Sequence, residues 1–322
     1  MNDNKLRIGV IGSQKWIDYF AEVFEDDEDF NVCIYKSFNK EIYRSIRRLD
    51  LIYVMFGWLD KTHLLIFLES SLHKIPTVVH WIGTDVYIMI NTSILSSKIK
   101  IKRLIIKFLF KIHKNCYHIS GAPWLEEELK SIGISSTYIP SIYPLASIDT
   151  PVYPLPETLI VLSYIPLGRE DFYGEEKLIK IAKNNPDINF IVVANSPDRK
   201  PKDLNNVEYY GWVSRERMKE LYRNSTCVLR LTKHDGLGGT IIEMLLRGRY
   251  GIFSYNHPHP YVYKATNCKE VQKALDEIKT KKDPNFDGAR FVKENYSTEI
   301  AKEKIKKFFF EILKGEHCEE SN

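Results

Sequence analysis

The chain has 322 residues, enough for two domains of about 150 residues each. Its 44% hydrophobic and 27% charged residues exclude a disordered or fibrous protein, and a net charge of +4 does not by itself indicate nucleic acid. Five widely spaced cysteines without a Cys-x-x-Cys pair argue against a disulfide framework and a zinc site. No secretory signal and no apolar run of about 18 residues is visible, so we expect a cytoplasmic protein.

The first half of the sequence alternates short apolar runs with amphipathic stretches. We predict strands at 5–12, 30–35, 51–56, 77–80 and 116–120, a short strand ending at Pro140, and helices reaching Phe24 and spanning 64–73 and 123–131. The run LIYVMF at 51–56 is apolar throughout, which is typical of a parallel strand covered on both faces. Repeated β-then-α order predicts a doubly wound α/β domain over residues 1–150.

A proline-rich stretch at 140–156 is interpreted as an interdomain linker. The alternation then restarts, with strands at 158–162, 189–193, 207–210, 226–231 and lastly 251–255, and helices at 175–184, 216–222, 240–247 and 271–278. A second α/β domain is therefore predicted over 151–297. The C-terminal segment 298–322 begins with an amphipathic helix, which we expect to pack back on the first domain.

A Gly-rich turn between a strand and a helix carries the most information. Residues 229–248 read LRLTKHDGLGGTIIEMLLRG. The turn glycines Gly236, Gly238 and Gly239 let a ligand approach the backbone, and amides at the helix start can surround an anion. Thr240 can cap the helix and also donate to a phosphate oxygen.

Two carboxylates flank this turn. Asp235 precedes it and Glu243 follows one turn inside the helix. Carboxylates repel phosphates, so their expected use is to accept hydrogen bonds from sugar hydroxyls beside a phosphate-sized pocket. A nucleotide sugar supplies both groups. The alternative is a tight loop in which Asp235 is only a helix-terminal charge, worth at most about 1 kcal/mol through the helix dipole.

The Asp-x7-Glu spacing in HDGLGGTIIEMLLRG resembles the E-x7-E signature of retaining glycosyltransferases of family four, with Asp235 in place of the first Glu. The segments 207–232 and 118–140 are similar to the same family, so the resemblance covers most of 117–255. It implies the GT-B fold, in which two Rossmann-like doubly wound domains face a central cleft. The acceptor would lie mainly on the first domain and a nucleotide-diphospho-sugar mainly on the second, with no metal or other cofactor.

The resemblance also assigns roles to individual residues. Asp235 would hold hydroxyls of the donor sugar, Glu243 would accept from the ribose hydroxyls, and the amides at 238–240 would hold the diphosphate. The segment from Gly211 to Val213 would lie near the nucleobase.

The basic partner of the diphosphate departs from the family pattern. In SYIPLGREDFYG, Arg169 fits the arginine of the pattern Gly-Arg-x4-Lys-Gly, but Tyr173 stands where the lysine belongs. Arg169 can bind phosphate oxygens in bidentate fashion and stabilise the leaving diphosphate. Either Arg230 or Lys233 replaces the lysine, or activity is reduced. The alternative role for Arg169 is an ion pair with a neighbouring acid.

Three residues of the first domain complete the candidate site. The segment HWIGTDVY is similar to a His-x-x-x-x-Asp segment of the family, which predicts that His80 binds the donor sugar or stabilises charge near its anomeric carbon, and that Asp85 orients a neighbouring group. The alternatives are a buried structural histidine and a turn or capping aspartate. Gly12 ends the first strand where the family has a loop near acceptor and diphosphate, although a simple strand-to-helix turn explains it equally.

Residues 97–115 form a basic amphipathic pattern with no acid anywhere between Asp85 and Glu126. Helical spacing places five basic residues on one face: Lys100, Arg103, Lys107, Lys111 and Lys114. Such a helix is typical of a peripheral protein on an anionic membrane surface, although an ordinary helix with a solvated basic face has the same pattern. No nucleic-acid-binding motif is present.

Together these features predict transfer of a hexosyl group, with retention and without a metal, from a nucleotide-diphospho-sugar to a hydroxyl of a glycan or lipid-linked acceptor. The expected setting is cell-surface polysaccharide or glycoconjugate synthesis, at the inner face of the cell membrane. Two alternatives remain open: a nucleotide-sugar epimerase, and a non-catalytic protein that binds nucleotide sugars in the same fold.

Overall fold

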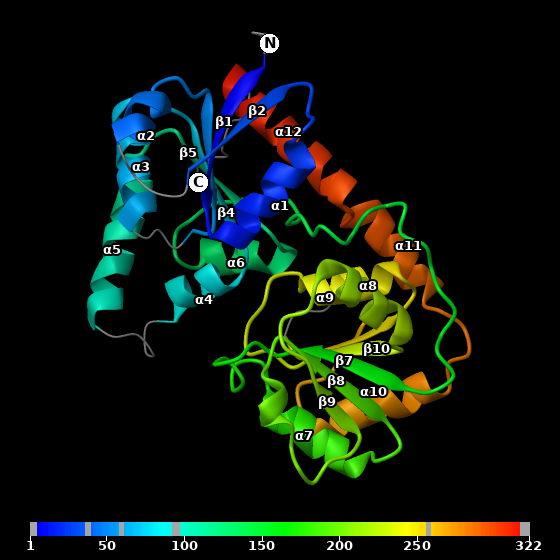
Figure 1. Cartoon of the computed structure of the whole chain (residues 1–322). Coiled ribbons are helices and arrows are strands. Elements are labelled where there is room, and N and C mark those ends of the chain that lie inside the picture. The colour runs from blue at the N-terminus through cyan, green and yellow to red at the C-terminus, as the bar shows by residue number, and fades with distance from the viewer. Residues whose placement is uncertain (1–4, 36–39, 58–60, 92–96, 256–258, 316–322) are drawn as a thin grey trace. The chain divides into compact units, whose positions relative to one another are not determined.

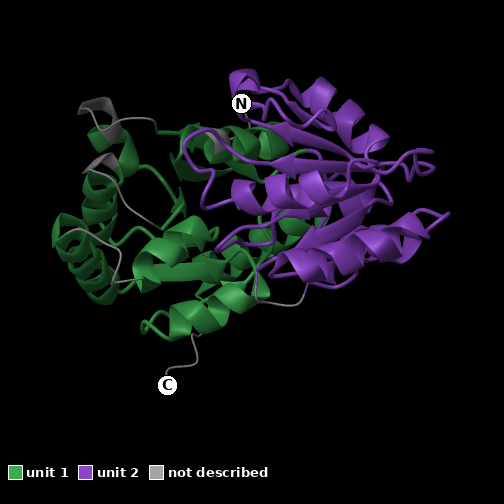
Figure 2. Cartoon of the chain, turned by 90° about the horizontal axis from the view of Figure 1, so that it is seen from below, with its two compact units in different colours: residues 1–144, 298–322 green, residues 145–297 purple. Residues whose placement is uncertain are grey.

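The computed structural model describes residues 5–35, 40–57, 61–91, 97–255 and 259–315. The chain forms two compact units, residues 1–144 with 298–322 (unit 1) and residues 145–297 (unit 2) (Figure 2). Each unit contains a six-stranded sheet whose paired strands all run parallel, which confirms the predicted fold class. The last part of the predicted C-terminal segment, 316–322, lies outside the described residues.

Unit 1 is a parallel sheet with strand order β2-β1-β3-β4-β5-β6 (Figure 1). Its strands are β1 (Leu6–Gly12), β2 (Phe30–Ile34), β3 (Leu51–Met55), β4 (Thr77–Trp81), β5 (Cys116–Ser120) and β6 (Thr137–Tyr138). Its helices are α1 (Gln14–Phe24), α2 (Lys40–Ile46), α3 (Lys61–Leu72), α4 (Thr84–Ile90), α5 (Ser97–Ile112), α6 (Pro123–Lys130) and α12 (Thr298–Lys314). The order of the strands reverses between β1 and β3, and ligands of doubly wound sheets bind at such a point.

The C-terminal helix α12 belongs to the core of unit 1. Its apolar residues Ile305 and Phe309 are fully buried in one cluster with Ile8 and Tyr53 of the sheet. An ion pair also holds the helix on unit 1: Lys306 Nζ lies 2.9 Å from Asp27 Oδ1. Burial raises the pKa of that carboxyl, but its lysine partners and a backbone hydrogen bond outweigh burial, so the net pKa is lowered.

Unit 2 is a parallel sheet with strand order β12-β11-β10-β7-β8-β9. Its strands are β7 (Ile160–Tyr164), β8 (Asn189–Val193), β9 (Val207–Tyr209), β10 (Cys227–Arg230), β11 (Tyr250–Phe253) and β12 (Tyr263–Lys264). Its helices are α7 (Glu175–Asn184), α8 (Arg215–Asn224), α9 (Gly239–Leu246), α10 (Cys268–Lys279) and α11 (Phe286–Asn295), with a 3₁₀ turn at Pro197–Arg199. Numbered from β7, the strands follow the dinucleotide-binding order 3-2-1-4-5-6, whose switch point lies between β7 and β10.

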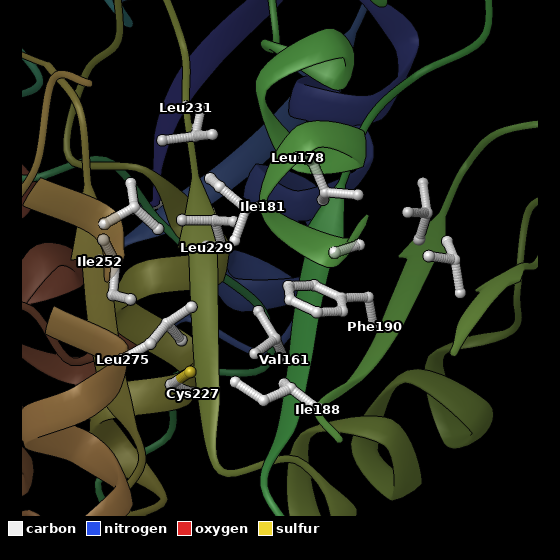
Figure 3. Packing of buried hydrophobic residues seen from close by; sticks show 14 of the residues in the cluster. Val161, Leu178, Ile181, Ile188, Phe190, Cys227, Leu229, Leu231, Ile252 and Leu275 are labelled. Atoms are coloured by element: carbon white, nitrogen blue, oxygen red, sulfur yellow. The ribbon is translucent and has the colours of Figure 1, made fainter. Parts of the chain in front are cut away.

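The core of unit 2 fills the space between its sheet and helices. One cluster of buried hydrophobic residues contains Val161 of β7, Leu178 of α7, Phe190 of β8, Leu229 of β10 and Leu275 of α10 (Figure 3). The first part of the unit is held by Arg249, which is fully buried and donates to the Pro154 carbonyl at 2.8 Å. The proline-rich stretch from Leu145 on is therefore part of unit 2 rather than a free linker.

The structure corrects several details of the predicted elements. The strand predicted at 251–255 is not the last, because β12 follows it. Helices α4 and α11 were not predicted, and neither was α2. Thr240 does not cap α9, because Gly238 occupies the N-cap position and Thr240 lies within the first turn.

Candidate functional site

The switch point of unit 2 brings two loops together at the carboxyl ends of β7 and β10. One loop, 165–174, leads into α7, and the other, 231–238, leads into α9. They touch directly, because the Lys233 amide donates to the Phe172 carbonyl at 3.0 Å. A Cβ on Gly174 would lie 2.5 Å from the Leu231 carbonyl oxygen, so only glycine allows this approach. The strand order therefore places the candidate site residues of both loops at one edge of the sheet.

The Gly-rich turn opens α9 with a left-handed residue. Gly238 has φ of +70°, a conformation that favours glycine, and its carbonyl accepts from the Ile241 amide at 2.8 Å. Gly236 and Gly238 are buried, whereas Gly239 and Thr240 are partly exposed. Amides in the first turn of a helix lack intrahelical partners and favour an anion. This start of α9 therefore has the backbone geometry that a phosphate group requires.

Arg230 is the centre of the polar contacts at this edge. It ends β10, is 8% exposed, and donates through Nε to Asp235 Oδ2 and through Nη1 to Thr240 Oγ1 at 3.3 Å. Burial is the largest single effect and lowers the pKa of the guanidinium, but the charge and hydrogen bond of Asp235, together with Tyr173 and Tyr164, outweigh burial, so the net pKa is raised. A permanent cation is thus held against the predicted diphosphate-binding turn.

Tyr173 links the two arginines of the site. The guanidinium carbon of Arg230 lies 5.3 Å from the centroid of the Tyr173 ring, and that of Arg169 lies 5.5 Å from it. Arg169 is exposed and also lies over Phe172, at 4.7 Å. Both guanidinium groups therefore contact the ring of the tyrosine that stands in place of the expected lysine.

The acids near these basic groups have other ion-pair partners. Glu170 pairs with Arg199 at 3.5 Å, and Asp171 pairs with Lys233, so neither neighbouring acid has Arg169 as its observed ion-pair partner. The Lys233 pair is largely exposed. Of the two candidates for replacing the lysine, Arg230 is the one positioned at the turn.

The two carboxylates of the Asp-x7-Glu pattern have different partners. Asp235 accepts from Arg230, whereas Glu243 accepts through Oε2 from the hydroxyl of Tyr222. Glu243 is 9% exposed, and Arg247 donates to its backbone carbonyl at 2.7 Å. Burial, together with the charge and hydrogen bond of Glu243, raises the pKa of Tyr222, which keeps its hydroxyl protonated. Tyr222 was not identified from the sequence, because only the fold brings α8 against α9.

An aromatic group lies beside the loop predicted to hold the nucleobase. Trp212, between Gly211 and Val213, is 72% exposed, and its ring centroid lies 6.2 Å from that of Tyr164 at the end of β7. A Cβ on Gly211 would meet nothing within 4 Å, so open space adjoins this glycine. Flat side chains beside open space can accommodate an aromatic base. Trp212 lies within the segment from Gly211 to Val213 predicted near the nucleobase, but the sequence did not indicate that its ring would be exposed.

Glycines also mark the carboxyl edge of the unit 1 sheet. Gly12, Gly57, Gly83 and Gly121 each end or closely follow one of four adjacent strands, β1, β3, β4 and β5. A Cβ on Gly12 would lie 2.4 Å from the Met55 carbonyl oxygen. Packing against β3 therefore accounts for this glycine without a ligand.

Asp85 holds this edge together from within. It is fully buried and accepts backbone hydrogen bonds from Gly57 at 2.7 Å, from Gly83 at 2.8 Å and also from Ile82 and Val86. Burial raises the pKa of the carboxyl more than these amides lower it. The structure thus gives Asp85 the turn-forming role named above as the alternative, and any effect on a ligand would pass through the loops that it fixes.

His80 is fully buried at the end of β4, where its Nδ1 hydrogen-bonds the hydroxyl of Tyr53. Its Nε2 makes no hydrogen bond of normal geometry within the described residues and lies 3.2 Å from a Cβ built on Gly121. Burial lowers the pKa of His80 to about 3, although the Ile139 backbone opposes this effect. The imidazole is therefore neutral at physiological pH. A neutral ring can donate or accept a hydrogen bond but contributes no charge.

No family model matches the chain, and no curated protein matches its sequence. Solved structures of similar fold do exist. A sucrose-phosphate synthase from Thermosynechococcus elongatus is 13% identical, with a TM-score of 0.68 over 97% of this chain and 100% of that one. Anabaena HepE, solved in complex with UDP and glucose, is 12% identical, with a TM-score of 0.70 over 95% and 99%. The lipopolysaccharide outer core galactosyltransferase WaaB is 14% identical, with a TM-score of 0.63 over 97% and 100%. The fold of this chain is thus GT-B.

Proposed function

We propose that this protein is a glycosyltransferase that uses a nucleotide-diphospho-sugar as donor. One observation carries the proposal: at the switch point of unit 2, Arg230 joins Asp235 to Thr240 at the start of α9, while Arg169 approaches from the facing loop. Cations and helix-start amides would bind the diphosphate, and a carboxylate beside them would accept from a sugar hydroxyl. Solved proteins of the same fold support the choice, since one binds UDP and glucose and another is a galactosyltransferase.

The proposed reaction transfers a hexosyl group with retention to a hydroxyl of a glycan or lipid-linked saccharide, in cell-surface polysaccharide or glycoconjugate synthesis. The C1–O bond to the diphosphate breaks, and a new C1–O bond forms to the acceptor oxygen. Arg169, Arg230 and the amides of α9 would stabilise the negative charge on the leaving diphosphate. The acceptor proton would pass to the departing phosphate on the same face of the sugar. Metal independence is part of the proposal, and unchanged turnover in excess chelator would support it.

The proposed location of the protein is the cytoplasmic face of the membrane, where lipid-linked acceptors present their hydroxyls. The support for this location is the cationic composition of α5, which carries six basic residues and no acidic one. Within the described residues, no helix is both long and apolar enough to cross a bilayer.

The test of the proposed function is nucleotide release from a panel of UDP- and GDP-sugars, with and without acceptors. Acceptor-dependent release with a glycosylated product would support a transferase. The variants Asp235→Ala and Glu243→Ala should each lower transfer strongly while the protein stays folded. Unchanged turnover in both variants would refute the assignment.

An epimerase is the second candidate, because a Listeria monocytogenes protein of the same fold has a provisional description as UDP-N-acetylglucosamine 2-epimerase. A hydrolysing epimerase would consume water and produce nucleotide and the epimeric free sugar without any other acceptor, and a non-hydrolysing one would convert the nucleotide sugar into its epimer. A non-catalytic binding protein would shift its melting temperature with nucleotide but release none. The same panel separates all three outcomes.

A further inference from the structure

Helix α5 presents three distinct faces. The face buried in unit 1 contains Ile106, Leu109 and Phe110. At about 100° per residue, Lys100, Arg103, Lys107 and Lys111 occupy a second arc of the helix, whereas Lys114 lies beyond its end at Ile112. The third face is an exposed apolar row of large side chains: Ile101, Leu104, Ile105, Phe108 and Ile112. We call this third face the apolar row.

The apolar row is strongly exposed within unit 1. Its members are 45–66% exposed, with Leu104 at 66% and Phe108 at 61%. Single exposed apolar residues are ordinary on protein surfaces, but a contiguous row along a 16-residue helix marks an interaction site. An ordinary amphipathic helix would have turned these residues inward. The helix instead buries a separate set, so the apolar row is left for another partner.

The charges around the row define the chemistry of that partner. Lys98, Lys100 and Lys111 are exposed on the same helix, and no acidic residue occurs from position 86 to 125. A protein partner would need a matching acidic and apolar surface. An anionic bilayer offers both features in one layer, phosphates at its surface and acyl chains below, and lysine side chains can reach the former while apolar side chains enter the latter.

We propose that the apolar row of α5 inserts into the boundary between headgroups and acyl chains of an anionic bilayer, with the flanking lysines contacting lipid phosphates. The helix then lies in the plane of the interface. This inference rests on the membrane location proposed above and identifies its contact surface, which is apolar as well as cationic. It predicts that charge alone does not account for binding.

The test is co-sedimentation of the full chain with vesicles of phosphatidylcholine alone or with phosphatidylglycerol. We expect sedimentation with the anionic vesicles that persists in part at high salt. The double variant Leu104→Ser/Phe108→Ser should weaken partitioning about tenfold or more. Phe286→Ser is the matched control, because Phe286 is 60% exposed in unit 2, and it should bind vesicles like the wild type.

Other outcomes overturn the inference. Wild-type binding of anionic vesicles by the double variant, with loss only in Lys100→Gln/Lys111→Gln, would show that attachment is purely electrostatic. Absence of vesicle binding by the wild type, with a dimer that the double variant abolishes in light scattering, would make a second copy of this chain the partner. Melting temperature and the thermal response to nucleoside diphosphates should be unchanged in the double variant. These readouts keep failure of membrane binding distinct from failure of the proposed transfer.

Discussion

Replacing Arg230 by glutamine removes the charge on which the candidate site depends. The guanidinium is 8% exposed and is the observed ion-pair partner of Asp235, whose side chain is 16% exposed. Breaking a buried ion pair by removing one partner costs about 3–5 kcal/mol. Because Asp235 keeps some contact with water, we expect the lower end, about 3 kcal/mol. In a unit of this size that corresponds to a fall of roughly 6–12 °C in melting temperature.

The same change should weaken nucleotide binding. Each hydrogen bond from a guanidinium to a charged phosphate contributes about 1.5–3 kcal/mol, which corresponds to roughly a tenfold to hundredfold rise in Kd. Calorimetric titration with UDP and GDP measures the effect directly. The stability loss and the affinity loss are separable, because titration below the melting temperature samples only the folded protein.

Lys233→Gln is the control for Arg230→Gln. Lys233 is paired with Asp171 on the surface, at 51% and 90% side-chain exposure, so its loss should change stability by at most about 1 kcal/mol and leave nucleotide affinity nearly unaltered. Arg230 would lose its proposed role if Lys233→Gln impaired nucleotide binding and Arg230→Gln did not.

Three further predictions address other residues. Asp235→Asn should lower transfer at least about a hundredfold while nucleoside diphosphate still binds; equal losses of both would contradict a role on the sugar. Gly57→Ala should destabilise unit 1 by about 1–3 kcal/mol, since its Cβ would lie 2.4 Å from the Trp81 ring, whereas Gly211→Ala, in open space, should melt like the wild type. Burial depresses the pKa of His80 to about 3, so on acidification the unfolded chain binds a proton at this histidine before the folded protein does. The contribution of His80 to the free energy of unfolding is therefore greatest above about pH 6.5 and falls as the pH is lowered toward 3. Between pH 6 and 4 the wild type should therefore lose about 2–3 kcal/mol more unfolding free energy than His80→Gln, as measured by urea melts.

The strands were predictable because both sheets are parallel and buried. Asn189–Val193 is apolar after its first residue, and the structure begins and ends this strand and Cys116–Ser120 at the predicted residues. Short helices were harder. Helix α4 has only seven residues and begins directly after the turn at Gly83, so it has no extended apolar period that could predict it. The buried carboxylate of Asp85 lies in its first turn.

The candidate site was predictable in its location but not in its contacts. Spacing placed Asp235, Thr240 and Glu243 around one turn, and in the structure this turn lies at the switch point of unit 2. The sequence could not indicate that Arg230 would bind Asp235, or that Tyr222 would bind Glu243 across 21 positions. Such pairs depend on packing between elements, which no local pattern encodes.

The exposed face of α5 shows the same limit. The pattern of Lys98–Lys114 separated basic from apolar residues, and from that pattern alone the apolar residues could have been core. The structure buries Ile106, Leu109 and Phe110 instead, because a helix of 16 residues has room for two apolar stripes and only one is needed against the sheet.

The return of α12 to unit 1 has a consequence for synthesis of the protein. Unit 1 completes its core with residues that are synthesised only after all of unit 2, since Lys306 bonds to Asp27 across 279 positions and Phe309 packs among the first strands. Unit 2 is continuous in sequence and can mature while translation proceeds. Until α12 emerges, the nascent amino-terminal part of unit 1 must keep apolar surface in water. We therefore expect chaperone dependence to concentrate in unit 1 rather than in unit 2.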